Sequence, residues 1–199
     1  MAAIFSSLQR TVIAGFVLAV IIVIVLHVTG AKMFALDHSW SLFAMRWLHI
    51  LSGVMWIGLL WYFNFVQTPM MPKIQPPELA GGVTKFIAPQ ALWWFRYGAL
   101  ATVVTGLALA GMNDNGQELI KGLTFQQPYR AIGIGMWMAL IMAFNVWFLI
   151  WPNQQKILGL VPATDAEKAK ARPIAGNASR FNTMFSIGML YCMAVQSHG

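Results

Sequence analysis

Arg46-Trp47-Leu48-His49-Ile50-Leu51-Ser52-Gly53-Val54-Met55-Trp56-Ile57-Gly58 places a histidine inside an apolar segment that continues to Phe65. A helix needs roughly 20 mostly apolar residues to cross a bilayer. Ionisable side chains inside such helices carry a high free-energy cost, so they mark candidate functional sites. Imidazole is also a common axial ligand of haem iron. We therefore predict a membrane helix over 46–65, with His49 as its functional residue.

The composition places the whole chain in the membrane class. Of its 199 residues, 58% are hydrophobic and only 10% are charged, whereas soluble domains carry about 25% charged residues. Four further apolar segments are predicted to span the membrane: 11–30, 93–111, 130–151 and, shortest of all, 182–196. Pro and Gly clusters between the segments are typical of helix ends. The prediction is an all-α polytopic membrane helix bundle with about five transmembrane helices, forming a single integral membrane domain over 1–199.

The basic residues predict the orientation of this bundle. The chain has 13 Lys and Arg and a formal net charge of +7. Nine of them lie on one side of the predicted spans: Arg10, Lys73, Lys85, Arg96, Lys156, Lys168, Lys170, Arg172 and Arg180. The remaining four lie on the other side: Lys32, Arg46, Lys121 and Arg130. Because cytoplasmic loops carry an excess of Lys and Arg, the N-terminus is predicted to be cytoplasmic and the C-terminus outside. This distribution follows membrane topology and does not indicate nucleic-acid binding.

The histidines gather near the predicted outer side. His27 lies three residues before the end of the first span, and His49 lies three residues after the start of the second. At 1.5 Å rise per residue, each imidazole lies about 5 Å inside its helix end. Two histidines at equal depth on adjacent helices suit axial ligation of one metal-centred group, a b haem. His27 is the preferred partner of His49, and the C-terminal His198 on the same side is the alternative.

Two further residues share the helix face of His49. Gly53 and Trp56 follow it at i+4 and i+7; Gly53 would admit a flat macrocycle, and Trp56 would pack against its edge. Each also has an ordinary explanation, since small residues pack membrane helices and tryptophan is enriched at membrane interfaces. Cys192 is the single cysteine, so covalent haem attachment through a CxxCH motif is excluded. The two histidines would also suit copper, but no further soft ligand stands at a fixed spacing.

Four blocks of sequence keep the order of motifs known from one family. They are the opening stretch followed by Trp61-Tyr62-Phe63, Pro89-Gln90-Ala91-Leu92-Trp93-Trp94-Phe95-Arg96-Tyr97 followed by Thr105-Gly106, Asn145-Val146 followed by Pro152-Asn153-Gln154, and Ser179-Arg180-Phe181-Asn182-Thr183 with the terminal Gln196-Ser197-His198. Together they resemble the membrane domain of the bacterial urate oxidase (urate hydroxylase) family. Members of that family pair this domain with an extracytoplasmic cytochrome c domain. The resemblance therefore implies a membrane b haem that transfers electrons to a cytochrome c.

The chain also departs from that family pattern. We expect no cytochrome c domain, because none follows the last predicted span up to Gly199, and apolar residues stand near Leu92 and at Phe181, where the family shows histidine. We therefore expect no inner-side haem site and no self-sufficient urate oxidase. The prediction is a small b-haem electron-transfer or accessory subunit of the bacterial inner membrane that exchanges electrons with an extracytoplasmic cytochrome. The alternative is a haem-free structural subunit of a larger respiratory or photosynthetic complex. The predicted partners of the chain are membrane lipids and either a larger membrane protein complex or a cytochrome c.

Overall fold

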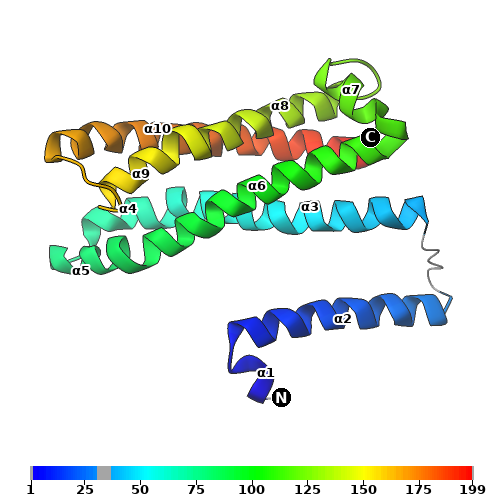
Figure 1. Cartoon of the computed structure of the whole chain (residues 1–199), viewed down its shortest axis with the longest axis horizontal. Coiled ribbons are helices and arrows are strands. Elements are labelled where there is room, and N and C mark those ends of the chain that lie inside the picture. The colour runs from blue at the N-terminus through cyan, green and yellow to red at the C-terminus, as the bar shows by residue number, and fades with distance from the viewer. Residues whose placement is uncertain (1, 31–36, 199) are drawn as a thin grey trace. The chain divides into compact units, whose positions relative to one another are not determined.

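The structure, a computed structural model, consists of helices and the turns that join them (Figure 1). It describes residues 2–30 and 37–198, without the side chains of residues 2, 3, 77, 197 and 198. Strands do not occur in the described residues, so the all-α class is confirmed. The chain divides into two units, Met1–Ser41 and Leu42–Gly199, which we describe separately. That they form one integral membrane domain stays a prediction.

The first unit contains a helix that is apolar on every side. It comprises α1 (Ala2–Phe5), α2 (Leu8–Val28) and the first residues of α3 (His38–Trp61). None of the 21 residues of α2 is buried. A helix that is hydrophobic all round needs an apolar environment on all sides, which a lipid bilayer supplies. The carboxylate of Asp37 begins α3 by accepting a hydrogen bond from the backbone amide of Trp40 at 3.0 Å.

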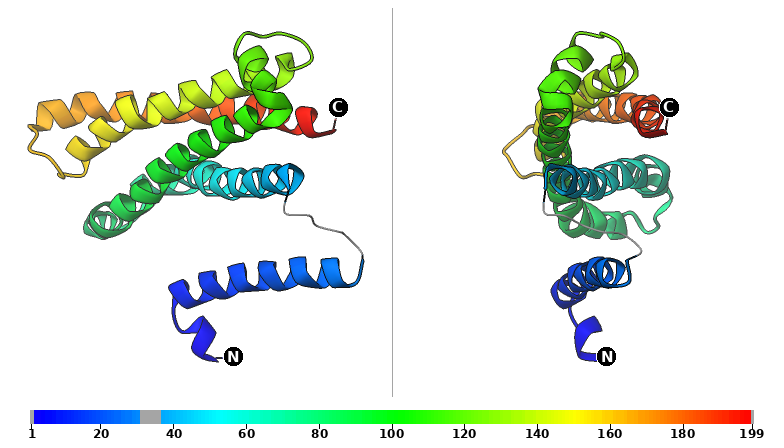
Figure 2. Two further views of the ribbon diagram at one scale, coloured as in Figure 1. Left: turned by 45° about the vertical axis from the view of Figure 1, so that its right-hand side comes forward. Right: turned by 90° about the vertical axis from the view of Figure 1, so that its right-hand side faces the viewer.

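The second unit is a bundle of long helices connected by shorter ones. After α3, its elements are η1 (Tyr62–Gln67), α4 (Thr68–Met70), η2 (Met71–Lys73), α5 (Pro77–Gly82), η3 (Val83–Ile87), α6 (Ala88–Met112), η4 (Asn113–Gly116), α7 (Gln117–Leu123), α8 (Arg130–Phe144), η5 (Asn145–Ile150), α9 (Trp151–Ile157) and α10 (Asp165–His198). The left view in Figure 2 shows α6 running obliquely past α3, and Figure 1 shows that α8 with α9 runs antiparallel to α10. We call the two ends of this bundle the α7 end and the α5 end, after the short helices that lie there.

Within residues 2–30 and 37–198, four helical stretches are long and apolar enough to cross a membrane. They are Leu8–Val28, His38–Lys73, Glu78–Leu123 and Arg130–Ile157. Each overlaps one of the first four predicted spans, so the multi-pass membrane character is supported by length and composition. The predicted fifth span, 182–196, lies within α10, which has 34 residues but is not among these four. The orientation of the termini stays a prediction.

In the part of the chain that the structure describes, three wide π-helical turns interrupt the long helices, and each precedes a proline. The segments η1, η3 and η5 end two residues before Pro69, Pro89 and Pro152, respectively. A proline has no backbone N–H, and its ring collides with the carbonyl four residues earlier. That carbonyl lies inside the π-helical segment in all three cases, so widening the turn relieves the collision while the helix continues. The proline-rich segment 67–92, which joins two predicted spans, is therefore largely helical.

The core of the second unit lies midway along its helices. Its largest fully buried apolar side chains are Trp56, Leu60, Phe95, Met142 and Val146. A layer of polar side chains adjoins this core. The amide of Asn145 donates to Asn182 Oδ1 at 2.8 Å, and Asn182 Nδ2 donates to the carbonyl of Met142 at 2.9 Å. These bonds join α8 and η5 to α10, in a setting where an unpaired polar group would be costly.

Candidate cofactor site

His49 is held against α6 by its Nδ1 atom. Nδ1 lies 3.0 Å from the backbone carbonyl of Thr102 and 3.2 Å from Thr105 Oγ1. The Thr105 hydroxyl already donates to the carbonyl of Ala101 at 2.6 Å. With the proton on Nδ1, the imidazole donates to the Thr102 carbonyl, and the lone pair of Nε2 stays available. This is the arrangement by which proteins orient an imidazole that binds a metal through its other nitrogen.

The close approach of α3 and α6 depends on Gly106. A Cβ atom added at this position would lie 2.8 Å from His49 Cε1 and 3.2 Å from Nδ1. Real Cβ atoms essentially never come as close as 2.8 Å. The missing side chain of Gly106 therefore leaves the space that the imidazole fills. This glycine positions His49.

His49 also lines a cavity of about 410 Å³ at the α7 end of the bundle. We call it the His49 cavity. Helices α3, α6, α7, α8 and α10 all contribute to its wall. Most of the lining side chains are apolar, among them Leu107, Ile132 and Leu140. The volume falls in the range of about 300–1,000 Å³ that is usual for small-molecule and cofactor pockets.

The polar groups of this cavity are few and are placed around its wall. Arg46 lies one helical turn before His49 on α3, and the buried Glu118 belongs to α7. Asn113 Nδ2 donates a hydrogen bond to Glu118, which fixes the carboxylate at the corner between α6 and α7. Both Arg46 and Asn113 line the same cavity as Glu118. An apolar pocket with a small number of fixed polar groups is typical of a cofactor site.

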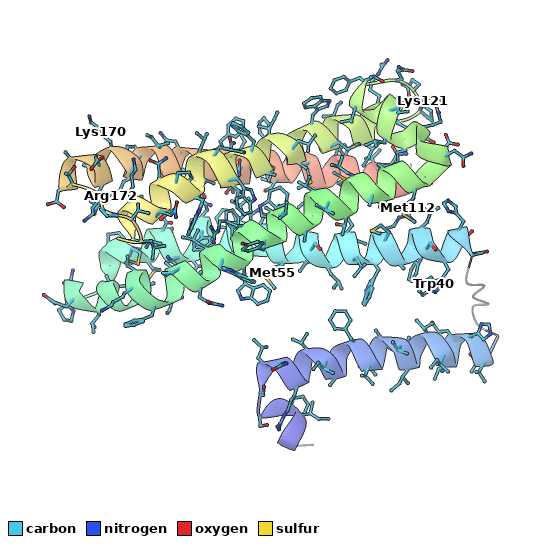
Figure 3. The ribbon with its side chains drawn as sticks, viewed as in Figure 1. Trp40, Met55, Met112, Lys121, Lys170 and Arg172 are labelled. Atoms are coloured by element: carbon cyan, nitrogen blue, oxygen red, sulfur yellow. The ribbon has the colours of Figure 1, made fainter. Side chains whose placement is uncertain are left out.

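The turn beside this corner is made by residues that tolerate left-handed backbone conformations. Asp114 and Asn115 have φ values of 47° and 53°, and Gly116 has 83°. Tyr129, which precedes α8, donates a hydrogen bond to Asp114 Oδ2 at 2.9 Å. This hydrogen bond to a carboxylate raises the pKa of the Tyr129 hydroxyl. Tyr129 therefore stays protonated at neutral pH and ties the turn to α8. Figure 3 shows this corner between the labelled Met112 and Lys121.

Sulfur ligands occur across the cavity from α3. Met136 on α8 and Met189 and Met193 on α10 all line it. Among the residues that the structure describes, no three His, Cys, Asp or Glu side chains come together. The donors therefore suit a metal that brings most of its own ligands and takes one or two axial ligands from the protein. Haem iron, with a histidine and a methionine as possible axial ligands, is such a metal.

Two residues predicted beside His49 have other surroundings. A Cβ added at Gly53 would lie 3.9 Å from Thr102 Cγ2, so α6 fills the face that was predicted to receive a macrocycle. Trp56 is fully buried in the bundle core and does not line the His49 cavity. It lies about 10 Å further along α3 at 1.5 Å per residue, beyond the cavity wall. The shared helix face was predicted correctly, but neither residue meets the cavity.

The two histidines predicted to pair with His49 stay predicted ligands. His27 is exposed on α2 in the first unit, so its pairing with His49 stays a prediction. His198 is the last residue of α10, and its side chain lies outside those described. Its backbone follows two residues after Gln196, which lines the His49 cavity. His198 therefore also remains a predicted ligand.

Several residues of this site were not found from the sequence. Gly106 and the Thr102 carbonyl lie more than 50 positions from His49 in the sequence. A local sequence pattern does not predict contacts between residues so far apart. Thr105 Oγ1 lies within hydrogen-bond distance of His49 on the neighbouring helix, while the hydroxyl of Thr102 donates within its own helix, to the carbonyl of Gly98. The short helix α7, which supplies Glu118, lies in a predicted loop.

Comparisons with known proteins add no relative to this picture. Neither a protein-family model, nor a curated protein, nor a solved structure matches the chain.

Proposed function

We propose that the His49 cavity binds a b haem and that the chain is a small electron-transfer subunit of the bacterial inner membrane. It would exchange electrons with an extracytoplasmic cytochrome. The observation that carries the proposal is the contact of His49 Nδ1 with the Thr102 carbonyl at 3.0 Å, because it leaves Nε2 as a ligand. The resemblance of the sequence to the membrane domain of bacterial urate oxidases supports the same cofactor.

Each part of the cavity has a role in this proposal. His49 would hold the iron, and a methionine of α8 or α10, or one of the predicted histidines, would be the second protein ligand. Arg46 would neutralise a haem carboxylate by a charge-assisted hydrogen bond. Apolar residues such as Ile132 and Leu140 would exclude water, and burial is one of the features that sets a haem potential. A bound b haem would supply reversible one-electron transfer.

A spectrum of the purified protein tests this proposal. The full chain is extracted in a mild detergent, and a reduced-minus-oxidised difference spectrum is recorded. We expect Soret and α bands of a b haem, and close to one haem per chain by pyridine extraction. Absence of both bands, together with no extractable haem after expression in a haem-sufficient host, overturns the proposal.

The haem-free structural subunit is the second candidate, and one surface favours it. Trp93, Trp94 and Tyr97 are exposed neighbours on α6, and their rings contact one another and Trp147 of η5. Aromatic residues of this kind are enriched at protein interfaces. This candidate predicts that a larger complex co-purifies with the chain and that the chain lacks haem. The same spectrum, measured on the isolated chain, therefore separates the two functions.

A further inference from the structure

A second cavity, of about 200 Å³, lies at the α5 end of the bundle. We call it the Gln67 cavity. On α3, Arg46, His49 and Ile50 line the His49 cavity, and Trp56 and Leu60 further along the helix belong to the core. Phe63, Asn64 and Gln67 of the following η1 line the Gln67 cavity. The two cavities are therefore separate sites at opposite ends of the bundle.

All three π-helical segments contribute side chains to the Gln67 cavity. Asn64 and Gln67 come from η1, Thr84 from η3 and Ile150 from η5. A π-helical turn, in which backbone hydrogen bonds join residues five positions apart, is rare and is frequently found at functional sites. Here three such turns, each followed by a proline, converge on one small volume. Their convergence on this cavity makes it a candidate ligand-binding site.

Gln67 has an unsatisfied acceptor in this cavity. Its Oε1 atom is buried and has no hydrogen-bond partner among the described residues. A buried acceptor without a partner costs about 1–3 kcal/mol, so a ligand that brings a hydroxyl or amine donor would be favoured. Asn64 on the same segment already donates to Ser179 Oγ at 2.7 Å and to the Leu60 carbonyl at 2.9 Å. Among the described residues that line this cavity, Gln67 Oε1 is thus the buried side-chain polar atom that has no hydrogen-bond partner.

Positive charge lies beside this acceptor. Arg180 of α10 lines the cavity, and it makes no ion pair or hydrogen bond with any residue that the structure describes. Further basic residues lie at the same end, among them Lys170 and Arg172, which Figure 3 labels near the start of α10. Apolar side chains also line the cavity, among them Phe63, Phe95 and Ile157. The cavity therefore combines a cation, an unpaired acceptor and an apolar wall.

From this combination we infer that the Gln67 cavity binds a hydroxyl-bearing phosphate ester, in the form of an anionic phospholipid head group. The phosphate pairs with Arg180, the head-group hydroxyl donates to Gln67 Oε1, and the apolar wall receives the carbons next to the ester. Basic pockets between membrane helices are known sites for anionic head groups. The same phosphate and hydroxyl also occur in soluble glycerol 3-phosphate, and the apolar wall favours the lipid.

The test uses the purified, delipidated full chain in detergent. Phosphatidylglycerol or phosphatidylcholine is added in mixed micelles, and the thermal unfolding temperature is measured against lipid concentration. We expect phosphatidylglycerol to raise this temperature saturably and phosphatidylcholine to leave it unchanged. Glycerol 3-phosphate is a second arm. If it binds at similar concentrations and competes with the lipid, the ligand is the soluble ester; if it does not compete, the ligand is the lipid.

Variants make the test specific to the cavity. Arg180→Gln and Gln67→Leu should each weaken the apparent affinity for phosphatidylglycerol about fivefold, the effect of about one surface charge or one hydrogen bond. Arg172→Gln on the same helix is the matched control, since Arg172 does not line the cavity. Gln67→Leu should not lower stability without lipid, because its Oε1 has no partner to lose. Equal responses to the two lipids with no effect of glycerol 3-phosphate, or equal weakening by Arg172→Gln and Arg180→Gln, would overturn the inference.

Discussion

Replacing Gly106 by alanine perturbs the contact between His49 and α6 directly. The new Cβ would lie 2.8 Å from His49 Cε1, 3.2 Å from Nδ1 and 3.7 Å from Nε2. Carbon atoms in optimal contact are about 3.5–4.0 Å apart, so the imidazole or α6 must move by about 1 Å. Such a movement also strains the 3.0 Å contact between Nδ1 and the Thr102 carbonyl.

The size of the effect follows from these two terms. Overpacking of a close contact costs about 1–3 kcal/mol, and loss of one hydrogen bond adds about 1 kcal/mol. We therefore expect Gly106→Ala to lower the free energy of unfolding by about 2–4 kcal/mol. The assay is equilibrium unfolding by sodium dodecyl sulfate in mixed micelles, followed by circular dichroism.

Two comparisons make this prediction refutable. Gly53→Ala on the facing helix is the matched control, because its Cβ would make an ordinary 3.9 Å contact with Thr102, and it should change stability by less than about 1 kcal/mol. In a His49→Ala background the collision is removed, so Gly106→Ala should cost at least about 1 kcal/mol less there. Equal stability of the two glycine variants, or an unchanged cost of Gly106→Ala without the imidazole, would refute the reasoning.

Two further predictions concern residues outside the His49 cavity. The buried Arg96 guanidinium lies 3.3 Å from the ring centre of Trp151, and a desolvated cation–π contact is worth about 2 kcal/mol; Trp151→Leu should therefore lower unfolding stability by about 2 kcal/mol more than Trp94→Leu, and equal losses would contradict it. The amide and hydroxyl of Thr164 donate to the Glu167 carboxylate at 2.8 and 2.9 Å, which lowers the pKa of Glu167. The carboxylate therefore stabilises the start of α10 at neutral pH and loses this effect as the pH falls through its lowered pKa. A carboxyl NMR titration should show the pKa of Glu167 rising part of the way toward its ordinary value in Thr164→Ala, because the backbone amide at this position still donates to the carboxylate. An unmoved pKa would exclude a contribution from the Thr164 hydroxyl.

Long apolar segments made most of the helices predictable. The four stretches that the structure makes long and apolar enough to cross a membrane each overlap a predicted span. The last span was predicted over 182–196, whereas α10 begins at Asp165, within the capping box Thr164-Asp165-Ala166-Glu167. In this capping box, Thr164 Oγ1 accepts a hydrogen bond from the Glu167 backbone amide at 3.3 Å, and the Glu167 carboxylate accepts one from the Thr164 backbone amide. The first turns of α10 are rich in charged residues, so a search for apolar segments does not include them.

The candidate site was predictable only in part, because its contacts join distant segments. An intramembrane histidine stands out in any hydropathy pattern, and His49 does line a cavity. Helical periodicity placed Gly53 and Trp56 on its face but gave no information about what α6 would place there. The sequence also did not predict the π-helical turns. A proline inside a helix predicts a kink or a break, whereas here the helix widens before Pro69 and Pro152 and then continues.

The haem content of two matched histidine variants tests the central claim most directly. Wild type, His49→Ala and His38→Ala are purified in parallel, and haem per chain is measured by pyridine extraction. His38 is the first residue of α3 and does not line the His49 cavity. The account predicts that His38→Ala keeps the wild-type haem content and spectrum, while His49→Ala loses the haem or shifts its bands. Wild-type haem content and an unchanged spectrum in His49→Ala would contradict the account.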